Sequence, residues 1–271
     1  MHPAHQAFQK WLHGKSPACI GQIRIQAGDR FELRHQLDEA APSPSLASYS
    51  DPFAARALAT YTDAGKFRPL KSAPNLRRGW RIAGLDFDGL ITALDCFYPA
   101  AIVHWHAQQT GQLEATSYRA CAARQTGMYR ITTKLTDEQA QRVAACCCED
   151  GECLKQPSWT IDEKTKLELS KPKVIDTNRL PIPCPEPCSL LLSFARKVVR
   201  LEQEEIMDVK FTRSDLELIG TVLRGVLAGT NDDYREGDYS DPRHRQRIRY
   251  FLKTHEHLPA PAENGSGEAE E

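Results

Sequence analysis

The hydrophobic and polar positions near the N-terminus alternate in two short runs. QIRIQ and RFELRH, residues 22–26 and 30–35, carry apolar side chains at every second position, which is the period of a half-buried strand. Only Ala27-Gly28-Asp29 separates them, so the pattern predicts a small antiparallel sheet. Apolar positions at helical spacing before His13 predict a short amphipathic helix ahead of the sheet.

Helical spacing prevails in the rest of the chain. The segment 51–63 predicts a helix with its cap at Ser50 or Asp51 and Pro52 in its first turn. A strand over 80–82 precedes helices over 87–97 and 100–109, which Pro99 separates. Residues 40–52 and 65–79 read as loop and extended chain.

A capping box starts the most informative helix. Thr136 and Gln139 form the box, and apolar positions continue at helical spacing into three consecutive cysteines and end near Gly151. Residues 160–182 are polar and predict a surface excursion. Further helices are predicted from Pro187 through 205 and over 214–227 and 241–255.

These elements predict an α+β protein in two domains. Residues 1–112 form a small antiparallel-sheet domain, residues 113–257 form a mostly helical, cysteine-rich domain, and residues 258–271 form a disordered acidic tail. The length of 271 residues and the content of 41% hydrophobic residues suit one large or two modest domains.

Composition narrows the choice of partners and of cellular compartment. The net charge of −1, with basic residues dispersed among acidic ones, predicts no nucleic-acid partner. No window resembles a secretory signal or approaches the roughly 18 apolar residues of a membrane span, so a cytoplasmic protein is expected. In a reducing compartment nine cysteines indicate metal or redox chemistry instead of a disulfide framework.

The cysteines gather in two clusters. CCCEDGEC holds four of them in residues 146–153, and IPCPEPC carries Cys184 and Cys188. Prolines fix the backbone between Cys184 and Cys188, and the first turn of the following helix favours a thiolate at Cys188. Cys148 and Cys153 form the simplest partner pair, while Cys147 falls on the apolar stripe of its helix. Four such thiolates suit a zinc ion or an iron–sulfur cluster, and spacing alone does not separate the two.

A family resemblance favours the cluster. The series APNLRRGW, CFYPAAIVHW, ARQTGMYR, the C-x4-C, CLKQPSW and PIPCPEPCSLLLSFAR resembles the iron–sulfur cluster-binding domain found C-terminal to paired CbiX-type sirohydrochlorin chelatase modules. The part from RFELRH through GKFRPLKSAPNLRRGW is similar to the stabilising domain that accompanies it. The resemblance implies a 4Fe-4S cluster on Cys148, Cys153, Cys184 and Cys188, with Cys147 and Cys121 as alternates.

The chain departs from this family in one respect. Nothing in it reads as a chelatase module, and the two histidines of His104-x-His106 would face different sides of a helix. We therefore expect an accessory protein that serves electron transfer, redox sensing or structural support. The family context suggests a sirohydrochlorin chelatase, or another enzyme of tetrapyrrole (sirohydrochlorin, cobalamin or sirohaem) metabolism, as its partner.

Four alternatives stay open. The clusters could hold structural zinc in an interaction protein. Asp86 and Asp88 in LDFDGL resemble the aspartate pair of magnesium-dependent haloacid-dehalogenase-like phosphatases, but the sequence favours Asp86 as the cap of the helix that follows it. A basic stretch could bind an anionic ligand such as a polycarboxylate tetrapyrrole, or be a solvated loop; it comprises Lys66, Arg68, Lys71, Arg77 and Arg78. Arg124 and Arg130 could neutralise a cluster, or lie on a helix surface.

Overall fold

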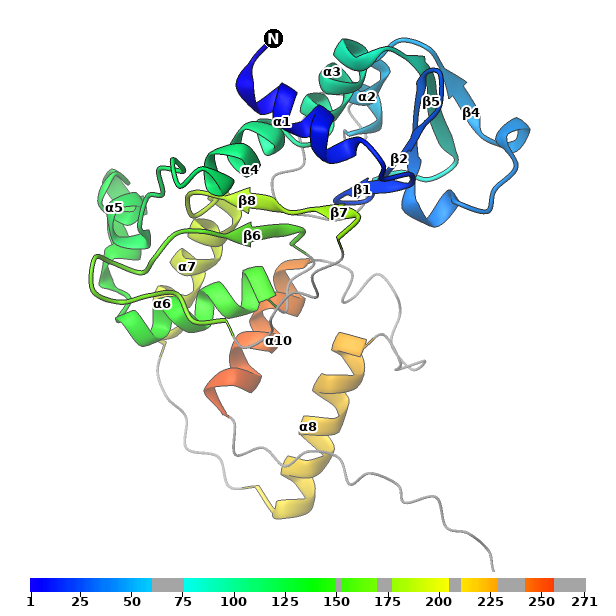
Figure 1. The fold of residues 1–271 in the computed structure, drawn as a ribbon. Helices are drawn as coiled ribbons and strands as arrows, with labels where there is room; N and C mark the ends of the chain where they lie inside the picture. The colour runs from blue at the N-terminus through cyan, green and yellow to red at the C-terminus, as the bar shows by residue number, and fades with distance from the viewer. Residues whose placement is uncertain (60–75, 150–152, 170–176, 205–210, 229–241, 256–271) are drawn as a thin grey trace, which may run out of the picture.

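The chain folds around two hydrophobic cores (Figure 1). The computed structural model describes residues 1–59, 76–149, 153–169, 177–204, 211–228 and 242–255. One core lies under a mixed sheet near the N-terminus, and the other lies among helices that follow residue 117. This arrangement is the predicted α+β class.

The first core is covered by a six-stranded sheet in the order β4-β5-β3-β2-β1-β7. Its strands are β1 (Ala18–Ile20), β2 (Ile23–Ala27), β3 (Phe31–His35), β4 (Ala47–Tyr49), β5 (Trp80–Leu85) and β7 (Arg179–Leu180). Strands β1, β2, β3 and β5 pair antiparallel, which confirms the predicted ribbon, while β4 and β7 add parallel edges. Neither edge strand has a readable period, because β4 is exposed throughout and β7 has two residues.

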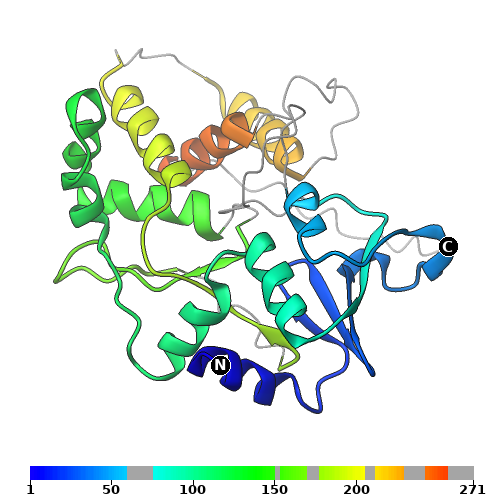
Figure 2. The same ribbon diagram turned by 90° about the horizontal axis from the view of Figure 1, so that it is seen from above.

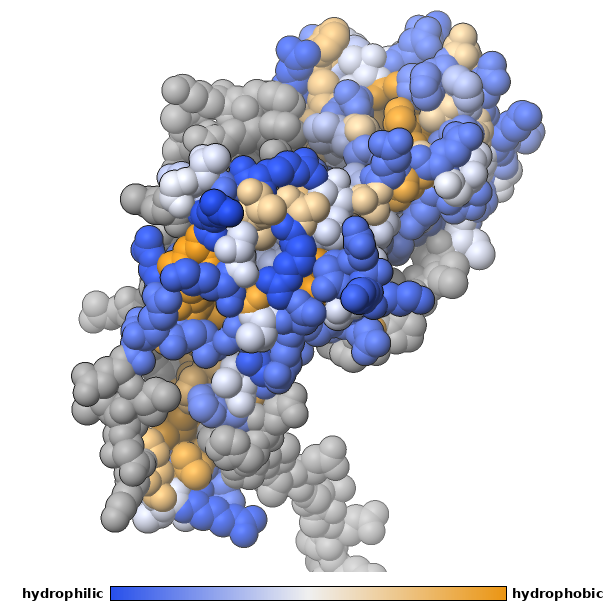
Figure 3. Space-filling view, turned by 90° about the vertical axis from the view of Figure 1, so that its left-hand side faces the viewer, coloured by the Kyte–Doolittle hydropathy of each residue, from blue (hydrophilic) through white to orange (hydrophobic). Residues whose placement is uncertain are grey.

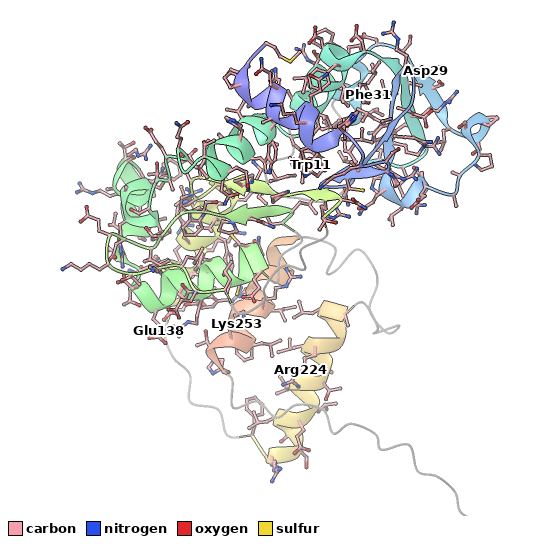
Figure 4. All side chains as sticks on the ribbon, in the orientation of Figure 1. Trp11, Asp29, Phe31, Glu138, Arg224 and Lys253 are labelled. Carbon is pink, nitrogen blue, oxygen red and sulfur yellow. The ribbon has the colours of Figure 1, made fainter. Side chains whose placement is uncertain are left out.

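Four helices contribute to this first core (Figures 1 and 2). They are α1 (Pro3–Leu12), α2 (Ala54–Leu58), α3 (Phe87–Phe97) and α4 (Ala101–Gln109). Helix α1 lies along α4, where the rings of Trp11 (labelled in Figure 4) and Trp105 meet edge to face at 6.2 Å. Trp80 of β5 stacks on Phe97 of α3 at 5.2 Å, which fixes α3 over the sheet.

The predicted cap of α3 is confirmed, whereas the start of α2 differs from the prediction. Asp86 caps α3, because its carboxylate accepts the amide of Gly89 at 2.8 Å. Helix α2, in contrast, begins at Ala54, three residues later than predicted. Asp51 accepts the amide of Phe53 and so closes a turn ahead of the helix. The predicted continuation of this helix to residue 63 falls outside the described residues.

The sheet ends in a short turn that contains a buried histidine. His35 is 2% exposed, and its Nδ1 accepts the amide of Leu37 at the 3-10 turn Gln36–Asp38. Burial lowers the pKa of His35, the Asp38 carboxylate opposes this, and the Arg78 guanidinium adds to it. Because the pKa is lowered in the folded state, the unfolded state takes up the proton first as the pH falls below about 6.5.

We therefore expect the folded state to lose stability as the pH falls from 7.5 to 5.5, in part through His35. His35→Asn keeps an acceptor for the Leu37 amide but cannot titrate, so its free energy of unfolding should fall less over this range. Urea denaturation of both proteins at the two pH values measures the difference. An equal loss in both proteins would show that His35 does not contribute.

The second core lies among α5 (Tyr118–Ala123), α6 (Asp137–Ala144) and α7 (Ser189–Leu201), with the 3-10 segment Gly127–Lys134. Arg119 of α5 forms an ion pair with Asp137 and donates to the carbonyl of Leu135 at 2.7 Å, which ties α5 to the start of α6. Thr136 and Gln139 form the predicted capping box. Helices α8 (Arg213–Ala228) and α10 (Pro242–Thr254) contact each other, and α10 also packs on α6. Among the described helices, none has the length and apolar content needed to cross a membrane.

The segment 160–182, predicted to be a polar surface excursion, is one only in part: Glu163 and Lys164 are exposed, whereas Ile161 and Leu180 are buried. The carbonyls of Thr160 and Ile161 accept the first amides of α5. The apolar residues of this run are scattered among polar ones, so the pattern could not reveal this docking. Residues 170–176 lie outside the described part.

One extended segment, residues 179–184, connects the two cores. Residues 179–180 pair with β1 as β7, and two residues later β8 (Ile182–Cys184) pairs parallel with β6 (Lys155–Pro157). The guanidinium of Arg179 donates to the carbonyl of Gly21 and to Gln36. Gly21 has a φ of 54°, and an added Cβ would lie 2.5 Å from the Tyr98 ring. The N-terminal sheet therefore holds the strand that ends at Cys184.

Candidate metal centre

Six cysteines from three segments lie around one region next to the second core. Cys146 to Cys148 follow α6, Cys153 precedes β6, and Cys184 and Cys188 bracket the turn between β8 and α7. Burial raises the pKa of Cys147 well above its ordinary value, and the thiols of Cys148, Cys146, Cys188 and Cys153 raise it further. Thiols that raise the pKa of Cys147 in this way are its close neighbours, and thiolates at such positions repel unless a cation lies between them.

The three consecutive cysteines occupy a π-turn. Helix α6 ends at Ala144, and Ala145–Glu149 continue it as one wider turn. Cys146 and Cys148 are buried at 0% and 8% exposure, whereas Cys147 is only partly buried. Cys147 packs against the second core as a partly buried neighbour, so the prediction that it belongs to the core holds in part. The π-turn changes the angular position of each residue, so the stripe extrapolated from α6 no longer applies.

The second pair of thiols stands at the start of α7. Cys188 is the N-cap of this helix, and no side chain caps it. The free amides of the first turn and the positive end of the helix dipole therefore face the position that Cys188 occupies, which suits an anionic cluster there. Burial raises the pKa of Cys184 to about 11, Lys155 lowers it, and the thiols of Cys188 and Cys153 raise it. The sulfur of Cys184 lies 3.1 Å from the carbonyl of Glu186 inside the turn.

Four of these cysteines share the same partial burial. They are Cys147, Cys153, Cys184 and Cys188, which come from the π-turn, the chain before β6, the end of β8 and the cap of α7. Among the described residues, no three His, Cys, Asp or Glu side chains stand close enough to hold one metal ion. In a four-iron cluster each thiolate binds a different iron atom, so its ligands lie farther apart than those of a single ion. The donor set fits such a cluster in type and number.

The nine cysteines, all of them in the described part, form no disulfide. The predicted ligand Cys148 lies in the second core beside Cys147, and it stays a predicted ligand. The alternate Cys121, on α5, is buried and lines a cavity together with Cys184 and Cys188.

Other predicted site residues lie elsewhere. Lys66, Arg68 and Lys71 fall outside the described residues, and Arg78 pairs with Asp38 at 3.1 Å. Asp86 and Asp88 are exposed, and Asp86 is occupied as a helix cap. The phosphatase interpretation required aspartates at the ends of buried parallel strands, whereas β5 continues from an antiparallel pair with β3 into the exposed cap.

Sequence reasoning missed one contact to the thiols. Gln246 of α10 donates from Nε2 to the sulfur of Cys147 at 3.8 Å. Hydrogen bonds to cluster sulfurs are one of the means by which proteins set the reduction potential. Nothing in the local pattern near residue 246 could have shown this, because the contact joins residues 99 positions apart.

The fold and the site define the class of protein. Half-buried thiols from three segments gather in one region, and the sheet domain holds one of these segments in place. This arrangement is typical of a cluster-binding protein that has a supporting domain. Residues 110–197 match the family described as 4Fe-4S iron-sulfur cluster binding domain, and residues 4–109 match the DR2241 stabilising domain. Residues 4–197 therefore comprise a DR2241 stabilising domain followed by a 4Fe-4S cluster-binding domain, and the cofactor is a 4Fe-4S cluster.

A solved structure supports this identification. The chain is similar to DR2241 from Deinococcus radiodurans, with a TM-score of 0.59 and 29% sequence identity over 74% of this chain. DR2241 is described as a multi-domain protein with structural similarity to chelatases and with two additional novel domains. The present chain spans 42% of its length. Among curated proteins, none matches the chain.

Proposed function

We propose that the protein is an electron-transfer accessory factor whose cluster is held by Cys147, Cys153, Cys184 and Cys188. The observation that supports this most directly is that the residues Cys153, Cys184 and Cys188 are only partly buried, and that a cavity of about 520 Å³ opens beside Cys184 and Cys188. Electron transfer needs a cofactor near the surface, whereas a purely structural cluster can be enclosed. When bound, the cluster supplies one-electron redox chemistry.

The chain contributes rigidity and charge. Prolines at 183, 185 and 187 restrict the backbone around Cys184 and Cys188, and β7 ties this segment to the N-terminal sheet. The start of α7 suits an anionic cluster at Cys188, and Gln246 donates to Cys147. The same residues would serve redox sensing, which is the second role that the site supports.

We further propose that the factor works with a tetrapyrrole enzyme such as a sirohydrochlorin chelatase. The neighbour DR2241 is described as chelatase-like with two additional domains, and two successive domains are matched here. We infer that the shared 42% of DR2241 corresponds to those two domains. Thiols without disulfides suit the reducing cytoplasm, where we expect the protein to act.

A redox titration of the anaerobically purified protein tests the proposal. We expect the visible absorbance to bleach on reduction with dithionite and to recover on reoxidation, with iron content unchanged over several cycles. Recovery below about half, with iron released, would refute an electron-transfer role and leave the cluster a structural or sensing element. Co-elution with a purified sirohydrochlorin chelatase on a sizing column tests the partner, and separate elution at micromolar concentration would refute it.

A further inference from the structure

The cavity beside the thiols is bounded by α4, the end of α5, β6 and the start of α7. It measures about 520 Å³, within the range of pockets that hold small organic molecules. Cys184 and Cys188 form part of its wall. Figure 3 faces the side of the molecule that carries α5, and it shows apolar patches set among hydrophilic side chains.

The charged residues that line the cavity are mostly basic. Three basic residues line it, Arg124, Lys155 and Arg196, and among the described lining residues Glu186 supplies the one carboxylate. Within the described part of the chain, neither Arg124 nor Arg196 forms an ion pair with a carboxylate. The guanidinium carbon of Arg196 lies over the ring of Tyr129, 4.7 Å from its centroid, which holds this side chain at the cavity.

The remaining wall adds apolar contact and further hydrogen-bond donors. Pro99, Pro185, Pro187 and Leu192 provide apolar surface. The first amides of α7 lie at the cavity, because Cys188 and Ser189 line it and no side chain caps the helix. Burial lowers the pKa of His104, with Lys155 adding to this and Glu186 opposing it, so the imidazole is a neutral hydrogen-bonding group at pH 7.

We propose that this cavity binds an organic anion that has an apolar body and two or more carboxylates, in contact with the side of the cluster held by Cys184 and Cys188. The guanidinium forks of Arg124 and Arg196 match carboxylates, and the proline wall matches the apolar body. Binding depends only on residues that line the cavity. The position of the anion against the cluster rests on the proposed ligand set.

Calorimetric titration of the cluster-loaded protein with benzene-1,3,5-tricarboxylate tests the site. We expect saturable binding to the wild type that weakens by about tenfold or more in Arg124→Gln and in Arg196→Gln, because each loses a charge-assisted hydrogen bond. Arg130→Gln, an exposed arginine outside the cavity, is the matched control and should bind as the wild type does. Equal melting temperatures of the four proteins would exclude unfolding as the cause.

Two further ligands test the chemical class. The neutral 1,3,5-benzenetrimethanol should not bind, and pyrophosphate, which has charge without an apolar body, should bind more weakly than the tricarboxylate. Pyrophosphate binding of equal or greater strength would overturn the assignment to carboxylates with an apolar body. Absence of saturable tricarboxylate binding, or equal binding by the arginine variants, would overturn the site.

A spectroscopic measurement tests the position of the anion. Saturation with the tricarboxylate should change the electron paramagnetic resonance spectrum of the reduced cluster in the wild type. Binding without any spectral change would overturn contact with the cluster. This failure is distinct from that of the proposed function, which is decided by reversible reduction of the protein without any added anion.

Discussion

Cys188→Ser is expected to abolish cluster binding, with iron and acid-labile sulfide falling at least about tenfold from about four of each per chain. A serine hydroxyl is not deprotonated at neutral pH and cannot replace the thiolate. Serine is, however, a preferred N-cap residue, so the substitution should preserve the start of α7, where Cys188 now occupies the cap. The change therefore removes the ligand while keeping the helix.

Colorimetric iron and sulfide determinations on anaerobically purified protein measure this effect, and far-ultraviolet circular dichroism reports the helices. Cys96→Ser is the matched control, because Cys96 lies on α3 and is buried in the first core, whereas the thiols of the candidate metal centre lie next to the second core. It should retain both elements in full. Full cluster content in Cys188→Ser would remove this residue from the ligand set.

The second large effect is expected at the π-turn, where adjacent cysteines should behave in opposite ways. Cys147→Ser should lose the cluster, because Cys147 is partly buried beside Cys153 and Cys188 and accepts a hydrogen bond from Gln246. Cys148→Ser should retain most iron and sulfide, because Cys148 lies in the second core. Its main cost should be a fall in stability of about 1 kcal/mol from burying a hydroxyl in place of a thiol.

Iron and sulfide contents of the two variants, purified side by side, decide between the two thiols. Loss of the cluster in Cys148→Ser with retention in Cys147→Ser would restore the ligand set implied by the family resemblance alone. Retention in both would direct attention to Cys121, which lines the cavity with Cys184 and Cys188.

Most regular elements could be predicted from the sequence, because their signals are local. The alternation in residues 22–35 gave β2 and β3, and helical spacing gave α3, α4, α6 and α7 within a few residues. The capping box at Thr136 and the cap at Asp86 were confirmed because each depends on residues three positions apart. Strands β4 and β7 were missed because short edge strands have no burial period.

The site was predictable in residue type and less so in detail. Clustered thiols and the CPEPC turn are visible in the sequence, but which cysteine faces the others depends on one extra residue in the turn after α6. The cavity residues Arg124, Lys155 and Arg196 come from three separate elements. Only the docking of α5, β6 and α7 brings them together, and no local pattern encodes that docking.

The central claim is that the chain holds a redox-active 4Fe-4S cluster on these thiols. Quantification of iron, acid-labile sulfide and zinc in the anaerobically purified protein, together with its visible spectrum, tests it most directly. We expect about four iron and four sulfide per chain, negligible zinc, and brown absorbance that bleaches on reduction. One zinc per chain with no sulfide, in a colourless protein that folds equally well in air, would contradict it.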